Sequence, residues 1–479
     1  MKKSQLLIDG QWVDALAGET IDVIDPCTAI PFGTIARGQV QDVDRAVKAA
    51  QGALDGAWGR MTATERGRIL QRLAQIIVAN GEELAQLEAR DTGKPMSVAR
   101  ADAAAVARYF EFYGGAADKI HGQTIPYLNG YNVSVVRVPH GVTGHIIPWN
   151  YPAQMMGRTL APALAMGNAA VVKPSEDACL SALKLAELAM EAGLPPGALN
   201  IVTGYGAEAG AALTAHPGVN FVTFTGSPEA GILVQQATAR NNVPCVLELG
   251  GKSPQIVFED ADFDKAIPII VKAISQNAGQ TCSAGSRLLI QQSVYDDVIK
   301  AVAKRFSQLR VGTPEMDLDC GPLISARQQS RVHAFIRNAV EQGIPLLAQG
   351  ELADGLSNKG FFIAPALFGQ VPRDTRIATQ EIFGPVLSAI PFFNEEDAIQ
   401  LANATEFGLV AGVWTENGSR QSRVAQRVAS GQVFINCYGA GGGVELPFGG
   451  VKKSGYGREK GFVALEEMST TKTIVQHFE

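Results

Sequence analysis

Two residues with complementary reactivity lie in glycine-rich stretches near the middle of this chain. Glu248 opens the stretch Glu-Leu-Gly-Gly-Lys at 248–252, and Cys282 lies in Gly-Gln-Thr-Cys-Ser-Ala-Gly at 279–285. A cysteine thiolate attacks electrophilic carbon, and a carboxylate can take a proton from water. A lone cysteine is more often a small buried residue, but the glycine and serine neighbours of Cys282 favour a nucleophile. The pair predicts covalent catalysis followed by hydrolysis.

Three further polar residues could assist this chemistry. Asn150 lies in Pro-Trp-Asn-Tyr-Pro at 148–152. Its amide could donate to a developing oxyanion, although an asparagine between two prolines also suits a turn. Lys173 and Glu176 follow an apolar run. At the end of a strand, such a lysine and acid could bind the hydroxyls of a ribose.

Two glycine-containing stretches suggest a site for phosphate. The glycines of 204–210 follow the spacing G-x-G-x-x-x-G, which is one residue longer than the usual dinucleotide fingerprint and is a weak signal alone. The stretch Phe-Thr-Gly-Ser at 224–227 precedes a helical segment. The first turn of a helix has free N–H groups that can bind an anion.

Alternating strands and helices between 140 and 250 would position these residues. The apolar runs end in polar or glycine-rich turns and cover 144–148, 169–173, 199–202, 221–224 and 245–248. Repeated βα units predict a parallel, doubly wound sheet, in which ligands bind beyond the carboxyl ends of the strands. Lys173, Gly204, Thr225 and Glu248 all lie at those ends, so we expect them to share one site.

The chain is too long for a single ordinary core, and its length suggests about three domains. We predict an α/β fold with a doubly wound, Rossmann-like cofactor domain, an α/β catalytic domain and a small β arm for oligomerisation. The cofactor domain comprises 1–117 and 140–250, and the catalytic domain comprises 251–450. The oligomerisation arm and the C-terminal segment comprise 118–139 and 451–479.

The arm is predicted from a hairpin signal. Two β-prone runs flank Asn129 and Gly130, a pair that is typical of a tight hairpin turn. The segment 470–476 is also β-prone. Long exposed hairpin edges tend to pair with other chains, so we expect a homodimer or a homotetramer.

Composition excludes several other classes of protein. The 479 residues are 46% hydrophobic and 18% charged, with a net charge of −6 and no basic run, so neither disorder nor nucleic-acid binding is expected. The chain contains neither a secretory signal nor a run of about 20 apolar residues, so no membrane is expected. Its six cysteines are scattered without a CxxC pair. We therefore expect no metal site and a cytoplasmic location.

These stretches, in this order, resemble those of the NAD(P)-dependent aldehyde dehydrogenase superfamily. Besides the stretches around Asn150, Glu248 and Cys282, the resemblance includes Glu-Ile-Phe-Gly-Pro-Val at 381–386. Pro-Phe-Gly-Gly at 447–450 and Ser-Gly-Tyr-Gly-Arg-Glu complete it, and we interpret these two as structural. A single short match is often accidental, but matches spread over most of the chain in the family's order are not.

The resemblance implies a role for each residue. Cys282 would attack an aldehyde, Asn150 would hold the oxyanion, and Glu248 would activate the water that releases the acid. Lys173 would orient the cofactor. Glu176 would repel a 2′-phosphate near the ribose, which favours NAD, with NADP possible. The implied cofactor-binding residues are Ile147, Trp149, Lys173, Glu176, Gly206, Gly226, Ser227, Leu249, Glu381 and Phe383.

Arg158 is a sequence clue to the identity of the substrate. Many relatives have an aromatic residue at this position, whereas several semialdehyde dehydrogenases have arginine. Its guanidinium could bind the far carboxylate of an ω-carboxylate semialdehyde, or it could form a structural ion pair. We therefore expect an ω-carboxylate semialdehyde. The alternative is a bulky aromatic aldehyde, because the small residues at 439–443, where relatives carry bulkier ones, would leave room for a larger substrate.

Two other functions are less well supported. A CoA-acylating dehydrogenase would usually lack the glutamate found at 248. A catalytically silent binding protein would tend to lose the cysteine found at 282. Both residues are present here, so we expect a hydrolytic aldehyde dehydrogenase acting on a small-molecule aldehyde.

Overall fold

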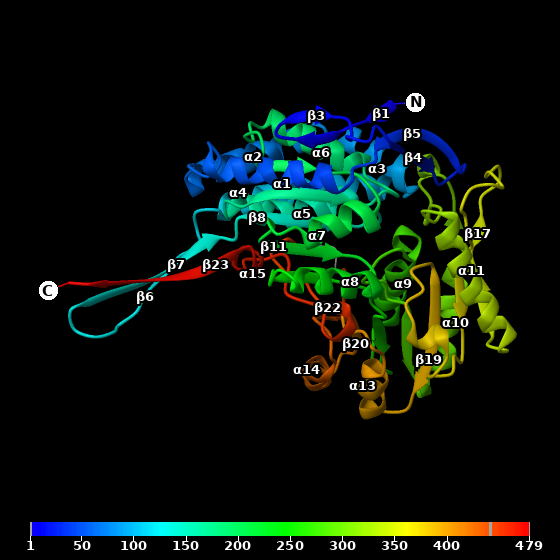
Figure 1. Cartoon of the computed structure of the whole chain (residues 1–479). Coiled ribbons are helices and arrows are strands. Elements are labelled where there is room, and N and C mark those ends of the chain that lie inside the picture. Colours follow the sequence, from blue (N-terminus) through cyan, green and yellow to red (C-terminus); the bar gives the residue numbers. More distant parts are fainter. Residues whose placement is uncertain (1, 440–442, 479) are drawn as a thin grey trace.

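The computed structural model describes residues 2–439 and 443–478, and it confirms the predicted α/β fold. Figure 1 shows two α/β units beside each other and a narrow β arm that extends away from them. The first unit contains most of the chain before residue 250, and the second contains most of the remainder.

The first unit is built on an eight-stranded sheet in the order β22-β12-β11-β8-β9-β10-β2-β3. Its five central strands are parallel and comprise β8 (Val142–Ile147), β9 (Ala169–Pro174), β10 (Leu199–Ile201), β11 (Phe221–Thr225) and β12 (Cys245–Glu248). The edges are antiparallel and comprise β2 (Leu6–Ile8), β3 (Gln11–Val13) and β22 (Gly455–Tyr456). The strand order reverses between β8 and β11, which is where ligands bind in such sheets.

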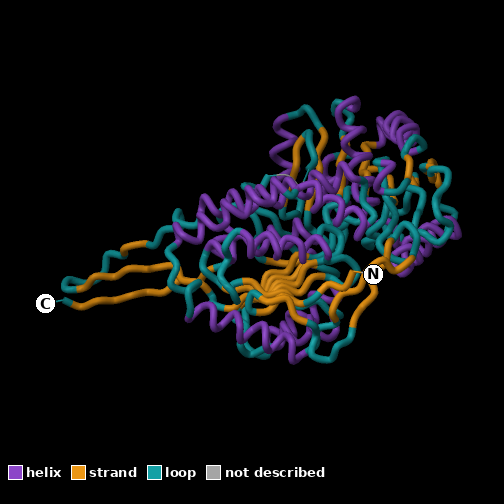
Figure 2. Tube along the Cα trace, turned by 90° about the horizontal axis from the view of Figure 1, so that it is seen from above, coloured by secondary structure: helices purple, strands orange, loops and turns teal. Residues whose placement is uncertain are grey.

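Helices cover both faces of this sheet, as Figure 2 shows from above. They are α1 (Val40–Asp55), α2 (Ala63–Ala79), α3 (Gly81–Thr92), α4 (Met96–Ala116), α5 (Pro152–Ala165), α6 (Leu180–Glu191), α7 (Ala211–Ala215) and α8 (Pro228–Ala239). Thr62 and Glu65 form the expected reciprocal capping box at the start of α2. Pro152 occupies the first turn of α5, where its missing N–H costs no hydrogen bond.

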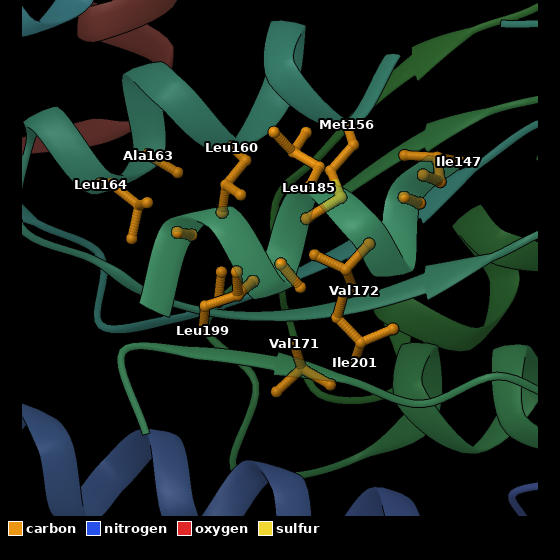
Figure 3. Packing of buried hydrophobic residues seen from close by; sticks show 14 of the residues in the cluster. Ile147, Met156, Leu160, Ala163, Leu164, Val171, Val172, Leu185, Leu199 and Ile201 are labelled. Atoms are coloured by element: carbon orange, nitrogen blue, oxygen red, sulfur yellow. The ribbon is translucent and has the colours of Figure 1, made fainter. Parts of the chain in front are cut away.

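The core of the first unit lies between α5, α6 and the central strands. The strands are apolar on both sides because helices pack on both faces. Figure 3 shows aliphatic side chains from these elements in contact, and all of those it labels are buried. This packing holds the carboxyl ends of β8, β9 and β12 at fixed positions along one edge of the sheet.

The second unit contains a seven-stranded sheet in the order β16-β18-β19-β14-β13-β20-β21. Its strands are β13 (Pro254–Val257), β14 (Arg287–Gln291), β16 (Leu346–Gln349), β18 (Ala366–Phe368), β19 (Val386–Phe392), β20 (Val410–Trp414) and β21 (Gln432–Ile435), and all but β16 are parallel. Its longer helices are α9 (Phe263–Ser275), α10 (Tyr295–Phe306), α11 (Ala326–Glu341), α13 (Glu395–Asn403) and α14 (Gly418–Arg427).

The apolar pattern of 262–278 is typical of a helix, but the helix in the structure is shorter. Asp262 caps α9, which stops at Ser275, and a short 3-10 turn, η2 (Gln276–Gly279), follows. Asn277 and Ala278 have φ values of 50° and 52°, which no α-helix permits. This turn redirects the chain toward Cys282.

The predicted arm consists of β6 (Gln123–Thr124), β7 (Tyr131–Pro139) and the C-terminal β23 (Ser469–His477). Gly130, with φ of +82°, forms the turn before β7, and β23 pairs antiparallel with the whole of β7. The C-terminus lies near the tip of the arm, far from both units (Figure 1).

The C-terminal segment 451–479 contributes strands and a helix, which are divided between the first unit and the arm. β22 pairs with β12, and α15 (Val463–Glu467) buries Ala464 and Leu465 in the core of the first unit. Only β23 joins the arm.

The smaller elements are β1 (Lys2–Ser4), β4 (Thr20–Asp25), β5 (Ile30–Ala36), β15 (Arg310–Val311), β17 (Glu351–Leu352) and α12 (Arg376–Thr379). Among the described residues, no helix combines the length and apolarity needed to cross a membrane.

Candidate active site

A cavity of about 620 Å³ contains Cys282 in its wall. It lies against α4, α5 and α9 and the loops that precede β14 and follow β21. Its lining includes four aromatic rings together with charged and polar groups: Tyr109, Tyr151, Tyr438, Phe448, Asp102, Arg158, Gln154 and Lys460. The cavity wall therefore combines aromatic rings with charged and polar groups.

Cys282 is placed by the tight turn that follows α9. Gly279 has φ of +72°, and a side chain there would lie 2.3 Å from the backbone of Gly384, so the turn requires glycine. Cys282 itself is partly exposed to the cavity. Burial raises the pKa of its thiol to about 12, and the guanidinium of Arg158 lowers it in part. In the ligand-free protein the sulfur is therefore a thiol at neutral pH, and attack on carbon requires loss of its proton.

Asn150 lies in the loop between β8 and α5, and its side chain reaches the second unit. Its Nδ2 donates to the carbonyl of Gln280 at 3.0 Å, two residues before the cysteine. Its own carbonyl accepts a bond from Asn277 Nδ2 at 3.1 Å. An amide nitrogen carries two hydrogens, so the bond to Gln280 does not use its full donor capacity.

Glu248 ends β12 and is buried. Burial raises the pKa of its carboxyl to about 8, with Arg158 opposing and Glu459 reinforcing the shift. A carboxyl group with a pKa near neutrality can act as a general base at physiological pH. Such perturbed acids occur preferentially at catalytic sites.

Arg158 connects Glu248 to a second carboxylate. It projects from α5, with its Nε 2.5 Å from Glu459 and an Nη 3.7 Å from Glu248. Its guanidinium lies 4.3 Å from the centre of the Phe448 ring. The structural ion pair that the sequence left open is therefore present, at a position that also lines the cavity.

Lys173 and Glu176 lie together beyond the end of β9. Lys173 Nζ is 2.7 Å from a Glu176 carboxylate oxygen, and the backbone N–H of Gly206 donates to the other oxygen at 3.4 Å. Although burial opposes ionisation, the Lys173 ammonium lowers the pKa of Glu176. The ionised Glu176 and Lys173 therefore lie together where β9 ends. Gly206 lies beside them, and no other atom of the described residues is near the position that a side chain on this glycine would occupy.

The other predicted cofactor residues continue along the same edge. Ile147 ends β8, and the N–H of Gly226 donates to the carbonyl of Glu248 at 3.0 Å. Ser227 caps α8, whose Gly231 approaches Leu249 so closely that a side chain there would lie 2.6 Å from it. The structure thus brings the segments 147–150, 173–176, 206, 226–227 and 248–249 to one side of the sheet.

Glu381 and Phe383 approach this edge from the second unit. Glu381 Oε1 accepts the Gly251 N–H at 2.9 Å, and burial raises the pKa of Glu381 to about 7. Phe383 makes an edge-to-face contact with Trp149, with ring centres 5.3 Å apart. Within the described residues, no group of three histidine, cysteine or acidic side chains could hold a metal ion.

Comparisons with known proteins identify the family of this chain. The family model "Aldehyde dehydrogenase family" matches residues 12–474. The chain belongs to the aldehyde dehydrogenase family. The family predicted from the motifs, and with it the NAD(P)-dependent aldehyde dehydrogenase class of enzyme, are confirmed.

Individual relatives cover almost the whole chain. Two mitochondrial plant proteins, aldehyde dehydrogenase family 2 member B4 of Arabidopsis thaliana and benzaldehyde dehydrogenase of Antirrhinum majus, are 43% and 42% identical over 98% of this chain and 88% of each relative. A candidate aldehyde dehydrogenase from Burkholderia cenocepacia is 59% identical with a TM-score of 0.99, covering 99% of this chain and 100% of that one. An NAD+ complex of aldehyde dehydrogenase from Bacillus cereus is 40% identical with a TM-score of 0.97, covering 100% and 97%.

Glu459 belongs to the candidate site of this aldehyde dehydrogenase, although the motif that contains it, 454–459, was interpreted as structural. Its side chain is buried beside Arg158 and accepts a bond from Thr223 at 2.9 Å. Its neighbours Arg458 and Lys460 are typical of an exposed segment, so the sequence contains no local signal for this buried acid. Of the small residues predicted to widen the cavity, Gly439 lines it, whereas 440–442 lie outside the described residues.

Proposed function

We propose that this aldehyde dehydrogenase uses NAD to oxidise aldehydes with an aromatic or otherwise bulky apolar body to carboxylic acids. The observation that carries the substrate class is the aromatic lining of the Cys282 cavity, to which Tyr109, Tyr151, Tyr438 and Phe448 contribute. Aromatic rings provide apolar area and edge-to-face contacts for a ring-bearing substrate. A relative that is 42% identical is named a benzaldehyde dehydrogenase.

The proposed chemistry begins at sulfur. After losing its proton, the Cys282 thiolate forms a C–S bond to the aldehyde carbon, and the carbonyl electrons move to oxygen. The side-chain amide of Asn150 and the backbone N–H of Cys282 would donate to this oxyanion. Bound NAD would supply the acceptor for the hydride that leaves this carbon, which converts the adduct into a thioester.

Hydrolysis of the thioester is assigned to Glu248. As a carboxylate, it would take a proton from water while the water oxygen bonds to the thioester carbon. The C–S bond then breaks, releasing the acid and restoring the thiolate. Arg158 and Glu459 flank Glu248 with opposite charges, and they would set the pH at which it becomes a base.

The residues at the sheet edge suit a dinucleotide. Lys173 and Glu176 would bind the adenosine ribose near Gly206, and the N-terminal turn of α8 behind Gly226 and Ser227 would receive the diphosphate. Glu381 would bind the nicotinamide ribose, with Ile147, Trp149, Leu249 and Phe383 enclosing that end. The ionised Glu176 would repel a 2′-phosphate, so we expect NADP to be used more slowly than NAD.

A panel of aldehydes would test this proposal directly. Benzaldehyde, a larger aromatic aldehyde, hexanal and succinic semialdehyde are mixed with the protein and either NAD or NADP, and reduced cofactor is followed by absorbance. The aromatic substrates with NAD should give the largest kcat/KM. A clear preference for hexanal or for NADP would contradict the corresponding part of the proposal.

A second candidate substrate is an ω-carboxylate semialdehyde, which Arg158 favours because it lines the cavity. However, Arg158 is already paired with Glu459 and lies near Glu248.

We therefore expect Arg158→Ala to lower kcat for benzaldehyde and for succinic semialdehyde by a similar factor, about 10-fold or more, because the substitution changes the charges around Glu248. Steady-state kinetics with both substrates measures this, and Arg72→Ala, an exposed arginine of α2, is the control. Selective loss of the semialdehyde would instead support a substrate-binding role.

The arm supports assembly into a homodimer or homotetramer. It carries exposed apolar side chains, including Ile474 at 47%, Val475 at 55% and Phe478 at 55% exposure. β23 is an edge strand of the arm's sheet, and an exposed edge with apolar side chains tends to pair with another chain. Replacing Ile474 and Val475 by serine should shift the protein to a smaller assembly in light scattering after size exclusion. Lys472→Ser on the same strand is the control, and a monomeric unmodified protein would contradict the assembly.

The proposal also includes hydrolysis of the thioester, catalytic activity and a cytoplasmic location. The site contains Cys282, Glu248 and Asn150, which supports hydrolysis rather than transfer of the acyl group to CoA. The same three residues support an active enzyme rather than a silent binding protein. The scattered cysteines support the cytoplasmic location expected from the sequence. Addition of CoA to the aldehyde assay should leave the carboxylic acid as the product.

A further inference from the structure

A buried lysine outside the proposed chemistry lies behind the oxyanion donor. Lys94 follows the left-handed Gly93 that ends α3, and its side chain is fully buried. Its Nζ donates to Glu88 at 2.8 Å, to Asp102 at 2.6 Å and to the backbone carbonyl of Asn150 at 3.0 Å. An ammonium group has three hydrogens, so each has a defined partner.

The neighbouring carboxylates keep Lys94 charged and hold its ammonium group in place. Although burial opposes a charged lysine, the carboxylates of Asp102 and Glu88 raise the pKa of Lys94, so it stays an ammonium at neutral pH. The ammonium also lies 4.5 Å from the centre of the Tyr151 ring. The second oxygen of Glu88 accepts from Ser181 at 2.7 Å and from the Ala153 N–H at 3.3 Å. The cluster therefore ties α3 and α4 to the first turn of α5.

The Asn150 peptide is held from two directions. Its carbonyl oxygen accepts from Lys94 on one side and from Asn277 at 3.1 Å on the other, which occupies both of its acceptor positions. With the peptide fixed, the side chain extends toward the carbonyl of Gln280. A hydroxyl contact of 2.8 Å between Tyr151 and Thr281 secures the next residue against the nucleophile loop.

We propose that Lys94 is a positioning residue for the oxidation of aldehydes, because its bond to the Asn150 carbonyl fixes the direction of the Asn150 amide. The inference rests on the proposed oxyanion role of Asn150. Lys94 binds neither substrate nor cofactor in this proposal. Its removal would leave the fold and the cavity largely in place but would let the amide depart from the geometry that stabilises the oxyanion.

A double-mutant cycle tests this inference. Lys94→Met keeps much of the side-chain volume but removes the three donors, and Asn150→Ala removes the oxyanion amide. Alone, Asn150→Ala should lower kcat by about 100- to 1000-fold, and Lys94→Met by about 10- to 100-fold with KM nearly unchanged. In the Asn150→Ala background, Lys94→Met should change kcat by less than about threefold, because its effect acts through the missing amide.

A control separates positioning from general destabilisation. Asp91 lies in the last turn of α3, three residues before Lys94, is equally buried and accepts the N–H groups of Cys179 and Leu180 at 2.8 Å each. Asp91→Asn should lower the melting temperature without lowering kcat. The double variant Lys94→Met/Asp102→Asn removes one cation and one carboxylate together, so only one buried carboxylate, that of Glu88, loses its cation. It should fold and show the same loss of kcat and the same lack of additivity.

The possible outcomes are distinct. If Lys94 variants that are folded by circular dichroism keep kcat within about threefold of the unmodified protein, or if their effect multiplies with that of Asn150→Ala, the positioning role is wrong. If Asn150→Ala itself retains full kcat, the oxyanion assignment fails and the inference fails with it. A loss of kcat that appears only when Asn150 is present supports the proposal.

Discussion

Cys282→Ala should abolish aldehyde oxidation. No C–S bond can form without the sulfur, and loss of a covalent nucleophile typically costs more than about 1000-fold in kcat. NADH absorbance with benzaldehyde measures the rate, and tryptophan fluorescence measures NAD binding, which should be unchanged. Cys245→Ala is the matched control, since that cysteine is also partly exposed but lies at the start of β12.

The interpretation depends on both measurements. An alanine variant that still forms NADH at more than a small fraction of the normal rate would show that Cys282 is not the nucleophile. A variant that no longer binds NAD would show that the loop at 279–285 shapes the cofactor site as well. Loss of turnover with normal NAD binding is the result that the structure predicts.

Glu248→Gln should separate the two halves of the reaction. The thiolate can still be acylated, so rapid mixing should show a burst of about one NADH per active site, followed by slow turnover. Loss of a general base typically lowers the rate by about 100- to 10,000-fold. A steady-state rate equal to that of the unmodified protein, or the absence of a burst, would contradict the assignment of hydrolysis to Glu248.

The pH dependence provides an independent check of the same residue. Burial raises the pKa of Glu248 from 4.5 to about 8, so turnover should rise with pH through about 8, and Glu248→Gln should lack this rise. The folded protein binds this proton more tightly than the unfolded chain does. The stability that the protonated group contributes is therefore fully present below pH 4.5 and is lost as the pH rises through about 8.

Much of the candidate site could be predicted because it lies at strand ends. The carboxyl ends of parallel strands meet at one edge, so Lys173, Thr225 and Glu248 were expected together before any comparison. The glycine and serine neighbours of Cys282 favoured a nucleophile, whereas Asn150 required the family resemblance, since an asparagine between prolines also suits a turn. The hairpin at Asn129 and Gly130 and the capping box of α2 were also evident, because both are set by local sequence.

The remaining features depend on contacts between distant segments. The ion pair of Arg158 required Glu459, which a short C-terminal strand brings back to the first sheet. The early end of α9 depends on the positive φ of Asn277 and Ala278, which the nucleophile loop imposes. Asparagine often adopts positive φ values, but alanine strongly favours the helix, so Ala278 does not indicate such a turn.

The bond between the Asn150 amide and the Gln280 carbonyl joins two separately built units. Large proteins fold unit by unit, and here neither unit alone contains both the Cys282 sulfur and the Asn150 amide. We therefore expect a partly synthesised chain not to oxidise aldehydes until both units have folded and packed together. Catalytic activity would then be one of the last properties that this molecule acquires as it matures.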